Sequence, residues 1–358
     1  MKKTFFTPGP TELYPEVKNY FAQAIEKSVC SINHRSKEFM HIYKSSVEEL
    51  KSLLNVPDNH HIFFLSSATE CMDRIIQNCV EERSFHFVNG AFAERFYKTA
   101  IELNKKAEKT EVEYGKGFDF KNIEIINSPE LISLTQNETS TGVSILLEDI
   151  YKLKTKYPDA LIAVDIVTSA PYVNLDFNKI DCAFFSVQKG FGLPAGLGVL
   201  IVNDKCMDKA HSLKKKNVSI GSYHNFISLF ENAAKHQTTE TPNVLGIYLV
   251  GRVSEHLNKY GINKVRIETE EKAKLLYDFF DYHKTSKPFV ENKTDRSKTI
   301  ICIKVGNRQN EVKRKLAESG ILVGSGYGTL KESQIRIANF PMHRIEDVRR
   351  ITEICGEI

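Results

Sequence analysis

The chain of 358 residues contains no tryptophan, and its net charge at pH 7 is only +4. Any aromatic ring that stacks on a ligand must therefore belong to Phe, Tyr or His. A small net charge, without a basic tract interleaved with aromatic residues, argues against nucleic acid as a partner. We expect the three consecutive lysines at 214–216 to lie on a solvated face.

Long apolar runs and paired cysteine motifs are missing too. No run reaches the length that spans a bilayer, and the N-terminal stretch MKKTFFTPGPTELYPEV lacks the apolar core of a signal peptide. The seven cysteines show no metal-ligand spacing, and their odd number favours free thiols. We therefore expect a cytoplasmic protein with neither a membrane segment nor a metal site. Cys182 and Cys302 lie in apolar runs, so we expect buried thiols there.

Short apolar runs recur along the chain and alternate with helix-length segments. This alternation is typical of βαβ units and predicts a mainly parallel sheet. The expected strands are 62–65, 85–88, 131–134, 160–165, 180–187 and 197–202. Helical periodicity is found at 35–54, 148–157 and 244–257.

The sequence changes character beyond Gly261. A long charged helix is expected at 264–283, and two strands are expected at 299–305 and 334–339. We predict an N-terminal arm, a large domain and a smaller C-terminal α+β domain. Their expected bounds are 1–14, 15–260 and 261–358.

One lysine stands between an expected strand and a glycine-rich turn, in SVQKGFGLPAGLGVL (186–200). A lysine in a low-dielectric setting has a depressed pKa and can attack an electrophile. An ordinary surface lysine in a turn is the alternative interpretation of Lys189. Pyridoxal phosphate is one suitable electrophile. Its site would also need a carboxylate for the pyridinium nitrogen, a stacking ring and a phosphate cradle.

Two residues could supply the carboxylate and the ring. Asp165 ends an expected strand and lies one crossover before Lys189, so both side chains can face the same crevice at the carboxyl edge of the sheet. Phe92 follows another expected strand in NGAFAERF. The alternatives are a helix-capping aspartate and a core phenylalanine.

Two polar stretches could supply the remaining contacts. LSSATECMDRII (65–76) places Ala68 and Thr69 at the start of a helix, where free N–H groups favour an anion. QNETSTGV (136–143) places Thr139 after an expected strand, within hydrogen-bonding reach of a ligand. The alternative interpretations are a helix N-cap for the first stretch and a polar turn with N-cap residues for the second.

Four motifs taken in order, NGxF, NETSTG, VDIVTS and SVQKGFGLPAGL, resemble the class V pyridoxal-phosphate aminotransferases of fold type I. The resemblance extends from PGPT (8–11) to IRIANFP (335–341), which is nearly the whole chain. It implies an α/β fold whose large domain has a mainly parallel seven-stranded sheet flanked by helices. It also implies pyridoxal phosphate as cofactor and ping-pong transamination between an amino acid and a 2-oxo acid.

The resemblance also implies roles for individual residues. Lys189 would hold the cofactor as a Schiff base, and Asp165 would pair with the pyridinium nitrogen. Phe92 would stack on the ring and Thr139 would hydrogen-bond it. The residues implied at the phosphate are Ala68, Thr69 and Gln188, with Thr241 reaching the phosphate of the neighbouring subunit. A homodimer with shared active sites follows from the last of these.

Substrate-binding residues are implied in the same way. Arg336 resembles the arginine that grips the substrate α-carboxylate, and His34 with Arg35 resembles a second anion site. A surface ion pair is the alternative for either arginine.

The motifs divide between two branches of the family. The chain length, NET, QKGFGLPAGL and the His34–Arg35 pair resemble the phosphoserine aminotransferases of serine biosynthesis, which use glutamate as amino donor. The segment 324–334 lacks their second His-Arg pair, however, and Phe92 replaces their usual tryptophan. PGPT, ETSTG and PAGLG also resemble the alanine- or serine-glyoxylate branch, which needs no phosphate site. We place the phosphoserine branch first.

Two more distant functions can be weighed against the sequence. A cysteine desulfurase-like lyase would need a nucleophilic cysteine on a mobile loop, but Cys302 and Cys355 fall in an expected strand and an expected helix. A non-catalytic cofactor-binding regulator would carry a DNA-binding module, for which we find no spare segment.

Overall fold

The computed structural model describes residues 3–358 and contains two main sheets. The larger sheet has seven strands, all parallel except β10, which runs antiparallel to both of its neighbours. In spatial order these strands are β2 (His60–Leu65), β10 (Gly198–Asn203), β9 (Cys182–Ser186), β8 (Leu161–Asp165), β5 (Leu131–Thr135), β3 (Arg83–Val88) and β4 (Lys106–Glu111). The predicted fold class is confirmed, and the six strands expected from this region are present.

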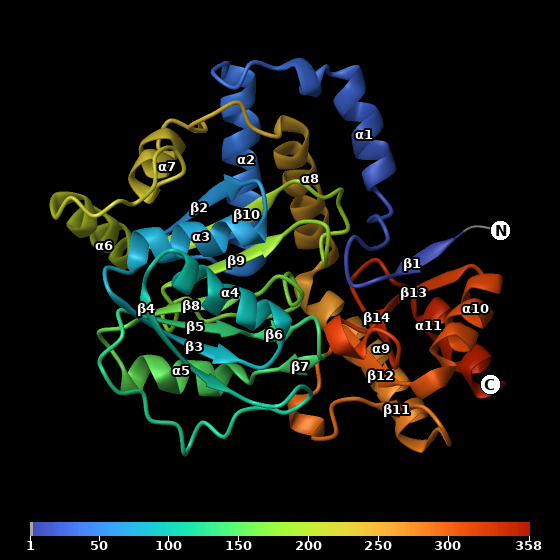
Figure 1. Cartoon of the computed structure of the whole chain (residues 1–358). Helices are drawn as coiled ribbons and strands as arrows, with labels where there is room; N and C mark the ends of the chain where they lie inside the picture. Colours follow the sequence, from blue (N-terminus) through green and yellow to red (C-terminus); the bar gives the residue numbers. More distant parts are fainter. Residues whose placement is uncertain (1–2) are drawn as a thin grey trace.

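Helices cover both faces of this sheet (Figure 1). The helices of this part of the chain are α1 (Val17–Glu26), α2 (Lys37–Leu54), α3 (Ala68–Cys79), α4 (Ala91–Glu102), α5 (Leu147–Lys156), α6 (Asp204–Lys215), α7 (Phe226–Ala233) and α8 (Val244–Tyr260). The predicted helices at 35–54, 148–157 and 244–257 correspond to α2, α5 and α8. A short hairpin of β6 (Asn137–Glu138) and β7 (Val143–Ser144) lies between β5 and α5.

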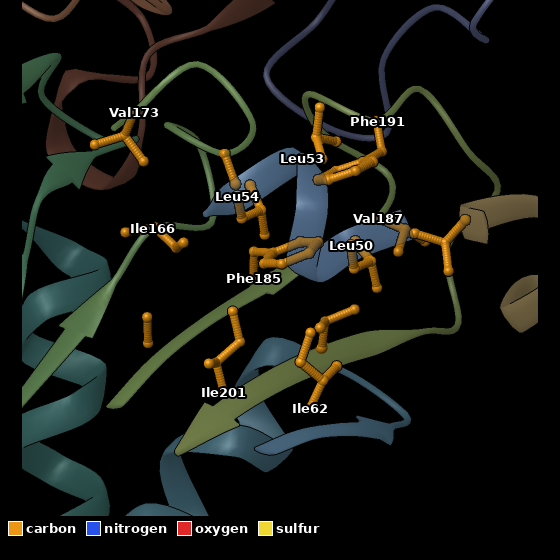
Figure 2. Packing of buried hydrophobic residues seen from close by; sticks show 14 of the residues in the cluster. Leu50, Leu53, Leu54, Ile62, Ile166, Val173, Phe185, Val187, Phe191 and Ile201 are labelled. Atoms are coloured by element: carbon orange, nitrogen blue, oxygen red, sulfur yellow. The ribbon is translucent and has the colours of Figure 1, made fainter. Parts of the chain in front are cut away.

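Alternate residues of each strand enter two separate cores, because successive side chains of a strand point to opposite faces. On β9, Ala183 and Phe185 join the core beneath α2 and α8, whereas Cys182 and Phe184 join the core beneath α3 and α6. Figure 2 shows Phe185 among leucines of α2 and Ile201 of β10. Burying each such side chain contributes about 1.5–3 kcal/mol. The continuous apolar runs seen in the sequence are therefore strands buried on both faces.

The smaller sheet combines the two ends of the chain. Its spatial order is β1 (Thr4–Phe6), β13 (Ile321–Ser325), β14 (Gln334–Ala338), β12 (Ile300–Lys304) and β11 (Lys287–Pro288). β1 runs parallel to β13, with Thr4 opposite Ile321. Figure 1 shows this pairing as a blue strand beside a red one. The sequence did not predict that the N-terminal arm would complete a C-terminal sheet.

Three helices pack around the smaller sheet. They are α9 (Ile262–Tyr282), α10 (Gln309–Glu318) and α11 (Ile345–Gly356). α9 and the strands β12 and β14 match the predicted elements. Across residues 3–358 no helix is both long enough and apolar enough to cross a membrane.

Candidate active site

A cavity of about 140 Å³ lies at the carboxyl edge of the seven-stranded sheet. β8 and β9 are adjacent and parallel, so Asp165 at the end of β8 and Lys189 just after β9 reach the same edge. Seven residues singled out from the sequence are among those that line it. The lining residues are Ser67, Ala68, Thr69, Met72, Phe92, Thr139, Asp165, Val167, Ser186, Gln188 and Lys189.

Lys189 is the only amine among these lining residues. Burial lowers the pKa of Lys189 to about 8, with a further lowering from the Arg336 guanidinium and an opposing effect from the Asp165 carboxylate. A substantial fraction of the lysine is therefore neutral near pH 8, which is the form that acts as a nucleophile or a base.

Gly9 of the N-terminal arm lies against the Lys189 side chain. Its φ is +142°, and a Cβ at this position would overlap the lysine Nζ. Only glycine fits this approach without displacing Lys189. The arm is therefore part of the site. PGPT entered the sequence analysis only as a family motif, and it gave no sign of this contact.

Asp165 is buried, and its carboxylate receives one hydrogen bond within the described chain, from Val167 N–H to Oδ1 at 2.8 Å. Burial raises the pKa of Asp165 to about 7, and Lys189 only partly opposes this. A cationic N–H group placed in the cavity would favour the carboxylate form. The pyridinium nitrogen of the implied cofactor is such a group.

The opposite end of the cavity suits an anion. α3 begins here with Ser67 as its N-cap, and Ala68 N–H donates to Ser186 Oγ at 2.8 Å. Thr69 is exposed at the first turn, where the helix dipole favours negative charge. The buried Oε1 of Gln188 has no hydrogen-bond partner in the described chain, so its amide is free to rotate and donate to a phosphate oxygen. These features fit a cofactor that carries a phosphate.

Phe92 is held in place by a buried carboxylate that the sequence analysis missed. Glu138 Oε2 accepts hydrogen bonds from the N–H groups of Phe92 and Ala93, at 3.1 and 2.9 Å. Its Oε1 accepts from Ser140, whose hydroxyl in turn accepts from Ala91 N–H. The free N–H groups of the first turn of α4 are thus satisfied from a neighbouring segment. In the sequence, Glu138 was indistinguishable from a polar turn residue.

Arg336 is connected to the cavity by Thr139. Its Nη1 donates to the Thr139 carbonyl at 3.0 Å, and its Nε donates to the Ser325 carbonyl at 2.8 Å. These two bonds fix the guanidinium and leave Nη2 without a hydrogen-bond partner among residues 3–358, so that it is available to a carboxylate. Thr139 Oγ1 lies 3.0 Å from Thr168 Oγ1.

Tyr327 is a second residue that the sequence analysis missed. Its ring centroid lies 5.4 Å from that of Phe92, and the Arg336 guanidinium lies 5.5 Å from the Tyr327 ring. Segment 324–334 had been interpreted only by the His-Arg pair that it lacks. It instead places an aromatic ring beside two predicted site residues.

Four of the predicted site residues are not among those that line the cavity of their own chain: Arg336, which contacts Thr139, and His34, Arg35 and Thr241. Arg35 is exposed, and its Nη1 donates to Gln237 Oε1 and to the Thr238 carbonyl, both at 2.8 Å. His34 precedes it and is half-buried. Thr241 is exposed and lies three residues beyond Thr238. Arg35 and Thr241 therefore belong to one surface region.

A histidine between two carboxylates joins this region to the cavity. His224 Nδ1 lies 2.5 Å from Glu70 Oε1, and its Nε2 lies 2.7 Å from Glu240 Oε2. Glu70 belongs to the first turn of α3, and Glu240 precedes Thr241. Burial lowers the pKa of His224, but its hydrogen bonds to Glu240 and Glu70 outweigh burial and raise the pKa to about 9. His224 is therefore charged at neutral pH.

This charged bridge predicts a particular dependence of stability on pH. The pKa of His224 rises from 6.5 to about 9 on folding, so its stabilising contribution is complete below pH 6.5 and is lost as the pH rises through 9. In thermal melts from pH 6.5 to 9.5, we expect the melting temperature to fall more steeply for the wild type than for His224→Asn. His211→Asn, at an exposed position of α6, is the control. Equal slopes for the wild type and His224→Asn would contradict the prediction.

Comparisons with known proteins show which family and which solved structures this chain resembles. The family model described as "Aminotransferase class-V" matches residues 5–350. The structure of a phosphoserine aminotransferase from Cytophaga hutchinsonii is 46% identical, has a TM-score of 0.97, and matches over 99% of this chain and 98% of that one. The phosphoserine aminotransferase of Rhodococcus opacus is 25% identical over 97% of this chain and 93% of its own length. An alanine–glyoxylate aminotransferase structure from Nostoc is 19% identical with a TM-score of 0.85 over 100% and 95% of the two chains, which shows a shared fold.

Proposed function

Since the chain belongs to the class-V aminotransferase family and is a pyridoxal-phosphate-dependent transaminase, we propose that its substrates are phosphoserine and 2-oxoglutarate. The observation that carries the proposal is the 46% identity with the Cytophaga hutchinsonii phosphoserine aminotransferase, which extends over 99% of this chain. The likeness to the alanine–glyoxylate enzyme is at the level of the fold. The phosphoserine branch is therefore favoured over the glyoxylate branch.

The cavity residues fit the cofactor at both of its ends. Asp165 would receive the ring nitrogen, Phe92 would cover one face of the ring, and the start of α3 with Gln188 would hold the phosphate. When bound, pyridoxal phosphate supplies an electron-withdrawing ring that stabilises negative charge at the substrate Cα. Asp165 keeps the ring nitrogen protonated, which maintains that withdrawal.

The chain's own groups then perform the proton transfer. Lys189 is the residue that would hold the cofactor covalently. Its neutral Nζ, once free, would accept the proton that leaves the substrate Cα, which its depressed pKa favours. Arg336 would bind the α-carboxylate through its guanidinium, where Nη2 has no hydrogen-bond partner among residues 3–358, and so orient the Cα–H bond. Gly9 allows the arm to pack over Lys189 and exclude water.

We assign the second anion site to a partner subunit. Lys189 and Arg336 both have other tasks, and the nearby cations His224 and Arg74 are paired with Glu70. Arg35 is held by Thr238 on the same exposed region as Thr241. A homodimer in which each chain lends His34, Arg35 and Thr241 to its partner would complete both sites. Arg35 would supply the guanidinium fork for the substrate phosphate.

The substrate proposal predicts a selective effect at Arg35. We expect Arg35→Ala to reduce kcat/KM for phosphoserine by a factor of about ten to several hundred, the worth of one or two charge-assisted hydrogen bonds. Alanine and serine should be affected far less, because Arg336 binds the α-carboxylate that all three share. Lys37→Ala, at an exposed lysine two residues away, is the control. Steady-state kinetics with each donor measure the effect.

The outcomes discriminate between substrates and between subunits. Equal losses for all donors would make Arg35 a structural or carboxylate-binding residue. A wild-type preference for alanine or serine with glyoxylate would establish the other branch instead. Mixed dimers of Arg35→Ala and Lys189→Ala chains should regain activity with phosphoserine if Arg35 acts across the interface, because one site per dimer is then intact. If Arg35 acts within its own chain, mixing restores nothing.

The cysteines provide evidence on the cellular location and on the alternative function as a cysteine desulfurase. All seven are free, which supports our proposal of a cytoplasmic, reducing environment. Burial raises the pKa of Cys302 and of Cys355 to about 12, so these two thiols stay protonated. Neither is suited to the nucleophilic role that a cysteine desulfurase requires.

A further inference from the structure

The turn between β13 and β14 presents one aromatic side chain between two glycines. A Cβ at Gly326 would overlap the Leu330 carbonyl oxygen, and Gly328 has a φ of +54°. Gly326 N–H donates to the Gln334 carbonyl at 2.8 Å, which closes the turn. The backbone therefore favours glycine on both sides of Tyr327 and fixes where this side chain emerges.

Tyr327 packs against two groups of the site that come from different elements, helix α4 and strand β14. Its ring lies 5.4 Å from Phe92 at the start of α4, and the guanidinium of Arg336 on β14 lies 5.5 Å from the ring. The contact with Arg336 has the distance of a cation–π interaction, which restrains the arginine on the side that its two backbone hydrogen bonds leave open. Tyr327 is 41% exposed, and its hydroxyl has no hydrogen-bond partner among residues 3–358.

The order of these groups from the cavity outward indicates which part of a substrate Tyr327 meets. The substrate amine reacts beside Lys189, and its α-carboxylate pairs with the half-buried Arg336. Tyr327 is more exposed than either of these residues and is not among those that line the cavity, so we place it at the rim of the site. An amino acid held by its amine and α-carboxylate would direct its side chain toward this rim.

The chemistry of the turn suits a neutral hydrogen bond to an anion. Residues 324–330, GSGYGTL, carry no charged side chain. The Ser325 hydroxyl already accepts from Lys313 Nζ at 2.7 Å. The unpartnered phenol of Tyr327 is thus an available donor, and a phosphate monoester presents several acceptor oxygens.

We propose that Tyr327 is a specificity-determining residue that donates a hydrogen bond from its hydroxyl to the distal phosphate of the substrate, while its ring fixes Arg336. This inference rests on the proposed phosphoserine activity and deepens it. Tyr327 supplies from the same chain the contact that complements Arg35 of a partner subunit. The ring acts on every amino acid substrate, and the hydroxyl acts on the phosphorylated one.

Two substitutions separate the hydroxyl from the ring. Tyr327→Phe should lower kcat/KM for phosphoserine by about tenfold or more, as expected for a hydrogen bond to a charged group, and change that for serine less than twofold. Tyr327→Leu should raise KM for both donors, because Arg336 loses its aromatic neighbour. The rise for serine should be absent in Tyr327→Phe, which keeps the ring. Tyr282→Phe, at an 87% exposed tyrosine of α9, is the matched control.

The results distinguish this inference from the activity on which it rests. The wild-type rate with phosphoserine tests the proposed function alone, and its absence overturns both proposals. If the wild type uses phosphoserine but Tyr327→Phe retains its full kcat/KM, the hydroxyl does not contact the phosphate and the inference is wrong. Equal losses with serine and phosphoserine would overturn it as well, because they would place Tyr327 at the α-carboxylate.

Discussion

Lys189→Ala is expected to lose turnover by about 10⁴-fold or more, because in the proposed mechanism one side chain provides both the covalent attachment and the proton transfer. Lys189 is the only amine among the lining residues of the cavity, so no neighbour there can substitute for it. Steady-state kinetics with phosphoserine measure the loss. A spectral titration with pyridoxal phosphate shows whether the variant still binds the cofactor.

Two controls make the result specific to this amine. Lys179→Ala removes an exposed lysine shortly before β9 and should behave like the wild type. Methylamine added to Lys189→Ala should restore part of the rate, because a small amine fits the space that the side chain leaves. A variant that retains a tenth of wild-type turnover would remove Lys189 from the mechanism.

Asp165→Asn is expected to slow the half-reaction with an amino donor by about 10³-fold while the cofactor still binds. The amide keeps the shape of the carboxylate but cannot hold a proton on the ring nitrogen. Rapid mixing of the cofactor-loaded variant with the donor gives the rate. An unchanged rate would exclude the pyridinium role.

The same substitution should stabilise the cofactor-free protein. Burial raises the pKa of Asp165 from 3.8 to about 7, so the favourable protonated state is complete below pH 3.8 and is lost as the pH rises through 7. Asparagine does not ionise. Cofactor-free Asp165→Asn should therefore melt at a higher temperature than the wild type at pH 8, and the difference should shrink toward pH 4. A lower melting temperature at pH 8 would show that the fold stabilises the carboxylate over the protonated acid and would contradict the prediction.

The sequence predicted the parts of the fold that depend on local pattern. Strands buried on both faces give continuous apolar runs, and these located β2, β3, β5, β8, β9 and β10. β4 was missed because it is an edge strand with the polar sequence KAEKTE (106–111). The antiparallel direction of β10 and the pairing of β1 with β13 depend on tertiary contacts, which a local pattern does not contain.

Some residues of the candidate site could also be predicted from local pattern, and others could not. Lys189, Asp165 and Phe92 follow buried strands, and parallel strands deliver such residues to one edge. Their chemical roles stay predictions. Glu138 was part of the NET motif without any sign of its structural role, and Tyr327 gave no signal, because the contacts of both are with residues distant in the chain. The contact of Gly9 with Lys189 could not be predicted either, because a glycine between two prolines is typical of an ordinary turn.

The pairing of β1 with β13 affects the order in which the protein can be completed during synthesis. Thr4–Phe6 leaves the ribosome early, but its partner Ile321–Ser325 emerges only after the seven-stranded sheet has been made. Until then the arm lacks its strand partner, and the hydrogen bond from Tyr14 N–H to the Gly192 carbonyl, at 2.8 Å, is a contact that it can already make with the large sheet's own loops. A nascent chain can thus assemble the large sheet before β1 is paired, and the arm over Lys189 is completed only once β13 has emerged.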